Sequence, residues 1–268
     1  MIVSIKKIAF VAAFEFAFIF TLSCGEHSLG AFLHESKKEN EEKKGGSSPC
    51  TLTDSRNGTI TDTRDGTIYK CVKIDSLIWM AENLNYDVPN NDTDKCYDND
   101  PAKCRTYGRL YNWATAMGVE AKYNNELLGI ESSLLGIESS GSYEKHQGIC
   151  PAGWHIPSRA EWNVLVVNAG RDAAAGRKLK ATSGWDDYYN VSGNGTDEYG
   201  FAALPGGAYD VNGLNGPGFY DVGHYGYWWT ALDNLKSAYY RFMQRAGEGV
   251  DSRFCLKDNM FSVRCVQD

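Results

Sequence analysis

The sequence predicts an α+β domain with two helices, short antiparallel sheets and long ordered loops. A helix signal begins at Ser158, because Glu161 follows three residues later ahead of an apolar run. Alternating strand patterns lie near both ends of the region after residue 50, and glycine is dense from Gly184 to Gly226. Strands that are separated from helices favour the α+β class, and closely spaced glycines favour long loops.

The composition is that of a folded, acidic protein. Of the 268 residues, 43% are hydrophobic and 13% are aromatic, which is enough for a packed core. The formal net charge is −7, with acidic and basic residues interspersed. No basic stripe, phosphate loop or dinucleotide fingerprint is visible, so we expect neither a nucleic-acid partner nor a cofactor.

The N-terminus predicts export. Lys6 and Lys7 precede an apolar run of about 15 residues, from Ile8 to Leu22, which is short for a membrane span. Residues 21–25 resemble the bacterial lipobox, with Thr where Leu is preferred. We therefore expect a signal peptide over 1–23 and a lipid on Cys24. The alternatives are an uncleaved signal anchor and ordinary secretion.

The chain from Cys24 onward divides into a tether and a folded domain, and the domain contains an insertion. Residues 24–49 are rich in Glu, Lys, Gly and Ser, which predicts a flexible tether that cannot bury a core. The folded domain is expected over 50–268. Within it, Leu127 to Ser133 recurs unchanged as Leu134 to Ser140, and we interpret 127–140 as a duplicated surface insertion.

The elements of the domain can be assigned in chain order. Asn57-Gly58 and Asp65-Gly66 each predict a hairpin turn, and an alternating strand covers 69–74. Helices are expected over 107–117 and 158–169, with loops over 184–226 between the second helix and the terminal strands. Those strands are expected over 238–245, 249–256 and 261–266, with a turn at 257–259.

The eight cysteines favour disulfides, because no CxxC spacing suits zinc and the export signal implies an oxidising compartment. Cys96 and Cys104 are expected to close a local loop, and Cys150 and Cys265 a long one. Cys71 and Cys255 can pair if the first strand lies beside the terminal hairpin, which leaves Cys50 without a partner. Sequence alone does not fix this connectivity.

Ordered blocks of sequence carry a family resemblance. They are 62–66 with 79–86, 107–113, 150–158, Glu161-Trp162, 200–207, 226–231 and 261–266. In this order they closely resemble the Fibrobacter succinogenes major paralogous domain, a family of bacterial surface and secreted proteins. The resemblance covers about residue 50 to the C-terminus, and the family's activity is not established.

The Trp-Trp segment and the last strand also resemble the C-type-lectin-like fold, especially its formylglycine-generating-enzyme branch. That likeness implies terminal strands near each other, two helices and a long-loop region that carries any site. The enzyme branch needs a cysteine pair after its tryptophan segment, and Ala231 to Arg241 contains none. The calcium-dependent sugar motifs of C-type lectins are absent as well, so no metal site is expected.

Aromatic residues with neighbouring carboxylates suit a carbohydrate, whose C–H faces stack on rings while its hydroxyls form hydrogen bonds. The glycine-rich region holds many such residues, although a core also needs aromatics and Trp228 and Trp229 are expected to be structural. The candidate ligand-binding residues are Trp185, Asp187, Tyr189, Asp197, Tyr209 and Tyr225.

No catalytic residue is expected. Adjacent acids such as Asp186 and Asp187 are better explained as solvated turns than as a hydrolase pair, and His155 as a buried, hydrogen-bonded histidine. We therefore predict a lipoprotein of the bacterial cell envelope, on the outer membrane surface, that recognises polysaccharide or another surface protein. The alternatives are a secreted protein, a formylglycine-generating-enzyme-like enzyme or hydrolase, and a structural envelope protein.

Overall fold

The computed structural model describes residues 49–89, 92–129, 145–171, 173–213 and 216–268. The expected signal peptide, Cys24 and the tether as far as residue 48 lie outside the described residues. So does the duplicated insertion from residue 130 onward. No helix in the described ranges is long and apolar enough to cross a bilayer.

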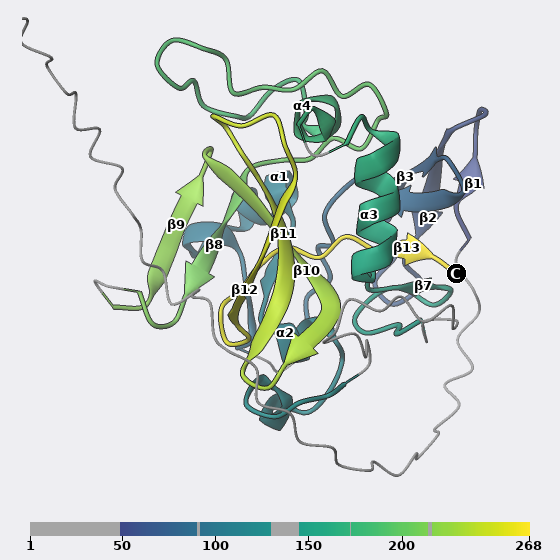
Figure 1. Cartoon of the computed structure of the whole chain (residues 1–268). Helices are drawn as coiled ribbons and strands as arrows, with labels where there is room; N and C mark the ends of the chain where they lie inside the picture. Colours follow the sequence, from purple (N-terminus) through teal and green to yellow (C-terminus); the bar gives the residue numbers. More distant parts are fainter. Residues whose placement is uncertain (1–48, 90–91, 130–144, 172, 214–215) are drawn as a thin grey trace, which may run out of the picture.

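One sheet joins the beginning and the end of the domain (Figure 1). Its strand order is β1-β2-β3-β4-β13-β7. The strands are β1 (Thr51–Leu52), β2 (Asn57–Thr61), β3 (Ile68–Ile74), β4 (Leu77–Met80), β13 (Val266–Gln267) and β7 (Trp154–His155). Val266 of β13 lies opposite Trp79 of β4 on one side and His155 of β7 on the other. The last strand is therefore held between an early strand and a middle one.

A second sheet has the order β12-β11-β10-β8-β9. Its strands are β12 (Asp251–Leu256), β11 (Ser237–Gln244), β10 (Tyr225–Asn234), β8 (Gly206–Asp210) and β9 (Gly218–Val222). A third pairing joins β5 (Asp94–Lys95) to β6 (Leu110–Tyr111). These sheets, with few helices, make the domain a mixed structure that is compatible with the predicted α+β class.

The helices are short. They are α1 (Pro101–Tyr107), α2 (Trp113–Ala116), α3 (Arg159–Asn168) and α4 (Ala175–Leu179), with 3-10 turns η1 (Tyr97–Asn99) and η2 (Ala121–Asn124). The capping box predicted at Ser158 and Glu161 is confirmed, since each residue's side chain accepts a hydrogen bond from the other's backbone N–H. α3 lies between the two larger sheets (Figure 1), and Trp162 on its inner face packs in one cluster with Trp79 of β4 and Trp228 of β10.

Tryptophan fills the centre of the domain. Trp79, Trp154, Trp162 and Trp228 are completely buried, and Trp229 is 1% exposed. The ring of Trp162 lies 5.0 Å from that of Trp79 and 6.0 Å from that of Trp228, measured between ring centroids. Trp228 and Trp229 are therefore core residues, as the sequence predicts.

Three disulfides tie the described chain together. Cys96–Cys104 and Cys150–Cys265 join the cysteines that the sequence analysis pairs, with sequence separations of 8 and 115. The pairing of Cys71 with Cys255 is wrong, because Cys71 is bonded to Cys50. The reason is the strand order: β1, which follows Cys50, runs beside β2 and so brings Cys50 next to β3, whereas Cys255 lies in the other sheet.

Two predicted elements take other forms. The helix expected over 107–117 is broken: α1 ends at Tyr107, Gly108 has a φ of 75°, and Leu110–Tyr111 form strand β6. A new helix, α2, then begins because the Asn112 side chain accepts a hydrogen bond from Thr115 N–H. Of the strand expected over 261–266, only Val266 lies in a strand, which is β13. Phe261 and Ser262 form isolated bridges to Tyr111 and Trp228.

Of the two hairpin turns predicted at glycines, the structure contains one. Asp65-Gly66 lies in the turn between β2 and β3, with Gly66 at a φ of 78°, as predicted. Asn57-Gly58 instead lies within β2, where a Cβ on Gly58 would stand 2.4 Å from the carbonyl oxygen of Thr51. Glycine is required at position 58 because the backbone of β1 lies so close to it, and not because the chain turns there. Likewise, the region 184–226 contains β8 and β9 besides loops.

Candidate functional site

A two-residue hairpin projects from the loop between α4 and β8. Tyr188 and Val191 exchange both backbone hydrogen bonds, at 2.8 and 2.9 Å. Tyr189 and Asn190 between them have φ angles of 46° and 62°, the pattern of a type I′ turn. Asn adopts this left-handed region readily, but a bulky ring does so at a cost. The turn therefore holds Tyr189 in a strained conformation at its tip.

The hairpin is fixed to the body by its base. Trp185 is only 3% exposed, and its indole N–H donates to Ala203 O at 2.9 Å. Its backbone N–H donates to the side chain of Asn194 on the returning strand, at 3.0 Å. A Cβ on Gly195 would stand 2.3 Å from Lys180 O, so only glycine lets the returning chain lie this close to α4. Hydrogen bonds and close packing hold the base against the body, whereas the tip reaches into solvent.

The hairpin forms one wall of a hollow with a volume of about 550 Å³. Two other segments complete it, namely α4 with the residues after it and the turn between β11 and β12. The lining residues are Arg177, Lys180, Tyr188, Tyr189, Val191, Ser192, Asn194, Gly195, Thr196, Arg245, Ala246, Gly247 and Glu248. This volume lies within the range of roughly 300–1,000 Å³ that is typical of small-ligand sites.

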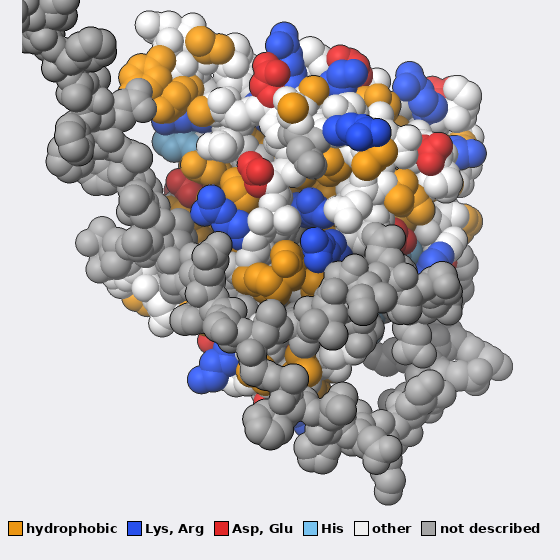
Figure 2. Space-filling view, viewed as in Figure 1, with side chains coloured by type: hydrophobic (Ala, Val, Ile, Leu, Met, Phe, Trp, Pro, Cys, Tyr) orange, Lys and Arg blue, Asp and Glu red, His pale blue; other side chains and the backbone are white. Residues whose placement is uncertain are grey.

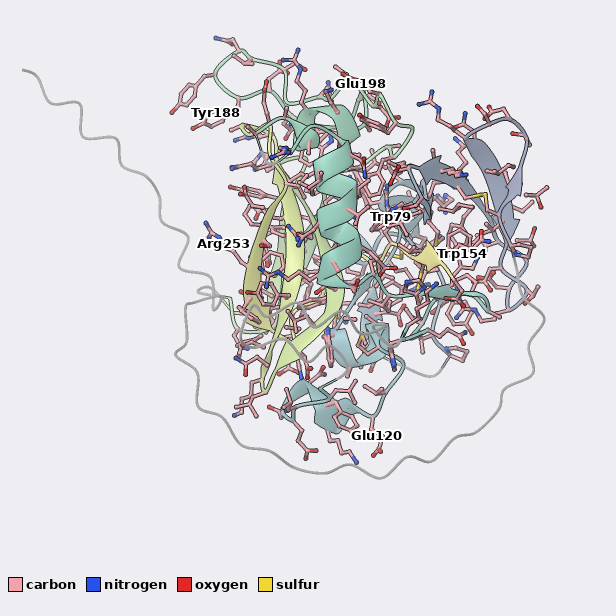
Figure 3. All side chains as sticks on the ribbon, turned by 45° about the vertical axis from the view of Figure 1, so that its right-hand side comes forward. Trp79, Glu120, Trp154, Tyr188, Glu198 and Arg253 are labelled. Carbon is pink, nitrogen blue, oxygen red and sulfur yellow. A yellow bond between two sulfur atoms is a disulfide. The ribbon has the colours of Figure 1, made fainter. Side chains whose placement is uncertain are left out.

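The tip of the hairpin is an exposed apolar patch beside this hollow. Tyr188, Tyr189 and Val191 are 42%, 84% and 69% exposed. The two tyrosine rings meet edge to face, with centroids 4.5 Å apart. In Figure 3, Tyr188 lies on the outer side of the loop, at the opposite end of the molecule from Glu120. Figure 2 shows apolar, basic and acidic side chains next to one another along this upper edge. The Tyr189 ring on this edge is 84% exposed and can stack on a ligand.

The floor of the hollow carries a buried lysine. Lys180 is 2% exposed, and its Nζ donates to Gln244 O at 3.2 Å and to Gly247 O at 3.1 Å. The ammonium also lies 5.0 Å from the centroid of the Trp185 ring. Burial lowers the pKa of Lys180 from its ordinary value to about 8, an effect that nearby Glu248 partly opposes. The floor is cationic at neutral pH.

The structure brings together only part of the predicted site. Tyr189 lines the hollow, and the carbonyl of Asp187 accepts a hydrogen bond from Arg245 at its edge. Trp185 lies beneath the hairpin and anchors it, so its ring is not available to a ligand. The Asp197 carboxylate accepts the Ala202 N–H at 2.8 Å, and burial raises its pKa. It therefore shapes the loop instead of facing the hollow.

The last two candidates lie elsewhere. Tyr209 packs against Phe219 of β9, with ring centroids 4.9 Å apart. Tyr225 stacks on Tyr227 within β10, at 5.5 Å and an interplanar angle of 6°. Neither tyrosine is among the residues that line the hollow. Sequence reasoning grouped them with Tyr189 only because all three lie in the glycine-rich region.

Sequence reasoning missed the three basic residues of the hollow. Arg177, Lys180 and Arg245 come from α4, from the residue after it and from the β11–β12 turn. They are separated by as many as 68 positions in the sequence, from 177 to 245, and no local motif joins them. The one available signal is weak and concerns Arg245 alone: it is the last residue of the strand predicted over 238–245, where a turn places side chains at the surface.

The carboxylates near the hollow do not form a hydrolytic pair. Glu248 is the acid among the lining residues, and it is paired with Arg177 at 3.1 Å. Asp186 faces His224 at 3.2 Å, and Glu198 faces Lys178 at the same distance. Within the described ranges no group of three His, Cys, Asp or Glu side chains is placed to hold a metal ion. The geometry thus offers aromatic rings, cations and hydrogen-bonding groups.

His155 has a structural environment. It is 2% exposed, with Nε2 2.8 Å from a Glu161 carboxylate oxygen and Nδ1 2.8 Å from an Asp268 carboxylate oxygen. Burial acts to raise the pKa of Glu161, but its contacts with His155 and Ser158 together outweigh burial and lower that pKa. The buried, hydrogen-bonded histidine that the sequence predicts is confirmed, and it ties the C-terminal residue to the start of α3.

Comparison with known proteins assigns a family. The family model described as the Fibrobacter succinogenes major domain matches residues 72–267. The chain belongs to this family. The Fibrobacter succinogenes major domain thus includes α3, the hairpin and all three segments of the hollow, while β1 and β2 precede the matched residues but pair in the same sheet. No curated protein and no solved structure matches the chain.

Proposed function

We propose that this chain is a bacterial surface protein that recognises polysaccharide through the hollow beside the Tyr188–Tyr189 hairpin. The observation that carries the proposal is Tyr189: an aromatic side chain that is 84% exposed and held by a strained backbone. Strained residues persist where the surrounding structure imposes them, and they concentrate at functional sites. A sugar face would stack on the ring while its hydroxyls bond to side chains of the hollow.

The polar lining supports this proposal. Ser192, Asn194 and Thr196 come from the returning strand of the hairpin, and Arg177 and Arg245 stand at the rim. Hydroxyl, amide and guanidinium groups can each bond to sugar hydroxyls. A recognition role needs these groups alone, without a nucleophile or an acid–base pair.

We also propose that the domain has a C-type-lectin-like fold. Three features support it. The terminal strand β13 pairs with the early strand β4, the helix α3 lies between two sheets, and a long loop between α4 and β8 carries the hollow. These are the features that the sequence resemblance implies for that fold.

Attachment at the cell envelope completes the proposal. The lipobox-like sequence before Cys24 and the polar stretch after it support a lipid anchor on the outer membrane surface, with a tether that extends the domain outward. Mass spectrometry of the intact protein tests this part. We expect loss of residues 1–23 and acylation of Cys24; a retained signal sequence, or Cys24 present as a thiol or in a disulfide, would contradict it.

Recognition is tested by retention of the purified chain on insoluble and arrayed polysaccharides. We expect retention that Tyr189→Ala reduces by about tenfold, since one stacked ring is worth on the order of 1–2 kcal/mol. Tyr123→Ala is the matched control, because Tyr123 is a half-buried tyrosine of η2, the 3-10 turn that Glu120 caps at the other end of the molecule (Figure 3). Equal retention of both variants would contradict the proposed site, and no retention on any polysaccharide would contradict the proposed function.

A further inference from the structure

The hollow has an excess of positive charge in a protein that is negative overall. Its lining contains Arg177, Lys180 and Arg245 against the acid Glu248, while the whole chain has a formal charge of −7. Glu248 is already paired, because its carboxylate lies 3.1 Å from the Arg177 guanidinium. Two cations therefore remain without an acidic partner in the lining.

Arg245 is the first of these cations. Its guanidinium lies 5.4 Å from the centroid of the Tyr188 ring, and one of its amino groups donates to Asp187 O at 3.3 Å. Asp221 is near enough to interact with it electrostatically, but no carboxylate in the described ranges forms an ion pair with it within 4.0 Å. A guanidinium that contacts one ring and one carbonyl still has N–H groups in its plane that are not used. A parallel pair of such donors suits the two oxygens of a carboxylate.

Lys180 is the second cation, and burial makes its charge more costly. Two carbonyl oxygens and the Trp185 ring surround the ammonium, but no described carboxylate pairs with it. The other charged groups of the hollow that face it are Arg177 of α4 and Glu248 of the β11–β12 turn. A buried ammonium without a counter-ion is stabilised when an anion enters the space above it.

We propose that the ligand of this hollow is an acidic polysaccharide, with the carboxylate of a uronic acid residue bound between Arg245 and Lys180. The sugar ring that bears the carboxylate would then stack on Tyr189 at the rim. This inference rests on the proposed recognition of polysaccharide and narrows it from carbohydrate in general to polymers that carry negative charge.

The test compares two polymers with one backbone. Polygalacturonate and its fully methyl-esterified form share one backbone and differ at the carboxyl group, which is an anion in the first and a neutral methyl ester in the second. Titration of the full chain with each should show at least tenfold tighter binding of the acid form. Arg245→Gln should reduce that binding by about tenfold, whereas Arg177→Gln, which removes the same charge from a cation that Glu248 already neutralises, should reduce it less than about threefold.

A second test uses a variant that should bind polygalacturonate more tightly than the parent chain. Glu248→Gln removes the only acid of the lining and releases Arg177 from its ion pair. We expect this variant to bind polygalacturonate about twofold to fivefold more tightly and the methyl ester no differently. Thermal unfolding of each variant should match the parent chain, because Arg177 and Glu248 are more than half exposed and Arg245 is half-buried at the rim.

The outcomes separate the two proposals. Equal binding of both polymers, lost in Tyr189→Ala, would overturn the inference of an acidic ligand and leave polysaccharide recognition standing. Tighter binding of polygalacturonate that Arg245→Gln and Arg177→Gln weaken equally would also overturn it, because that result indicates general electrostatic attraction. Failure to bind any polymer would overturn both.

Discussion

The body of the domain and the hairpin above it use aromatic residues in opposite ways. In the body, Trp79, Trp162 and Trp228 are completely buried in one cluster, and the described residues around them include the disulfides Cys50–Cys71, Cys96–Cys104 and Cys150–Cys265. In the hairpin, Tyr188 and Tyr189 are largely exposed, and Tyr189 lies in a backbone conformation that disfavours its side chain. The body gains stability from its rings, whereas the hairpin loses stability to display them.

The two regions also differ in their charged groups. The body buries the pair of Lys257 and Asp233 at 2.7 Å, with both side chains at 0% exposure. The hollow has an exposed pair, Arg177 with Glu248, and two further cations, Lys180 and Arg245, that form no ion pair with an acid of the lining. The charges of Lys257 and Asp233 thus satisfy each other inside the body, whereas the charges of Lys180 and Arg245 remain available to a ligand. This difference predicts how the regions should respond to substitution.

The largest effect should follow loss of the long disulfide. Replacing Cys150 and Cys265 together by Ser opens a loop with a sequence separation of 115, which should cost about 5 kcal/mol of unfolding free energy. The matched change at Cys96 and Cys104, separated by 8, should cost somewhat under ~3 kcal/mol. Denaturant unfolding measures both. Equal losses would show that the body is not stabilised by its long closure.

The buried ion pair should rank next. Asp233→Asn leaves the Lys257 ammonium with carbonyl oxygens of Tyr123 and Glu126 but no anion, and should cost roughly 3 kcal/mol. Glu248→Gln breaks the exposed pair of the hollow and should change unfolding free energy by less than about 0.5 kcal/mol. Chemical denaturation of the two variants compares the regions directly. A larger loss of unfolding free energy for Glu248→Gln than for Asp233→Asn would contradict the proposed difference between the two regions.

The pH dependence of the unfolding free energy should reveal the lowered pKa of Lys180. Its pKa in the folded state is about 8, against 10.5 ordinarily, so from pH 8 to 10.5 the unfolded chain binds more protons at this residue. Stability from this group therefore rises with pH across that window, by up to about 3 kcal/mol. The difference in unfolding free energy between the parent chain and Lys180→Met should change by that amount. A flat difference would mean that Lys180 is well solvated.

Ligand binding adds a second readout for the same residue. An anion above Lys180 should raise its pKa, so binding of polygalacturonate at pH 8 should take up part of a proton. Calorimetry in buffers of different ionisation enthalpy measures this uptake, and Lys180→Met should remove it. Binding of the acidic polymer without proton uptake in the parent chain would place the carboxylate away from Lys180.

Local signals predicted the body better than the hollow. The helix at Ser158 and the strand over 69–74 follow from capping and alternation, which act within a few residues. The short elements between 107 and 117 could not be predicted, because Gly108 and Asn112 divide an apolar run whose pattern alone favours one helix. Cys50 was left over because its partner depends on the strand order of the sheet.

The site was predictable only in part, for a related reason. The exposed Tyr189 lies next to Asn190, a residue that is common in type I′ turns, but sequence does not show that a Tyr occupies the other turn position. Trp185 looks like an equally good ligand residue until its burial is known. Arg245 reaches the hollow through the β11–β12 turn, and this meeting of distant segments is a product of the tertiary fold.

The central claim, that the hairpin is strained in order to display Tyr189, is tested most directly by Tyr189→Asn. Asn adopts positive φ more easily than Tyr, so the account predicts a gain of about 0.5–1 kcal/mol in unfolding free energy together with about tenfold weaker polysaccharide binding. Denaturant unfolding and polymer titration on the same sample measure both quantities. A variant that is less stable, or that binds as tightly as the parent chain, would contradict the claim.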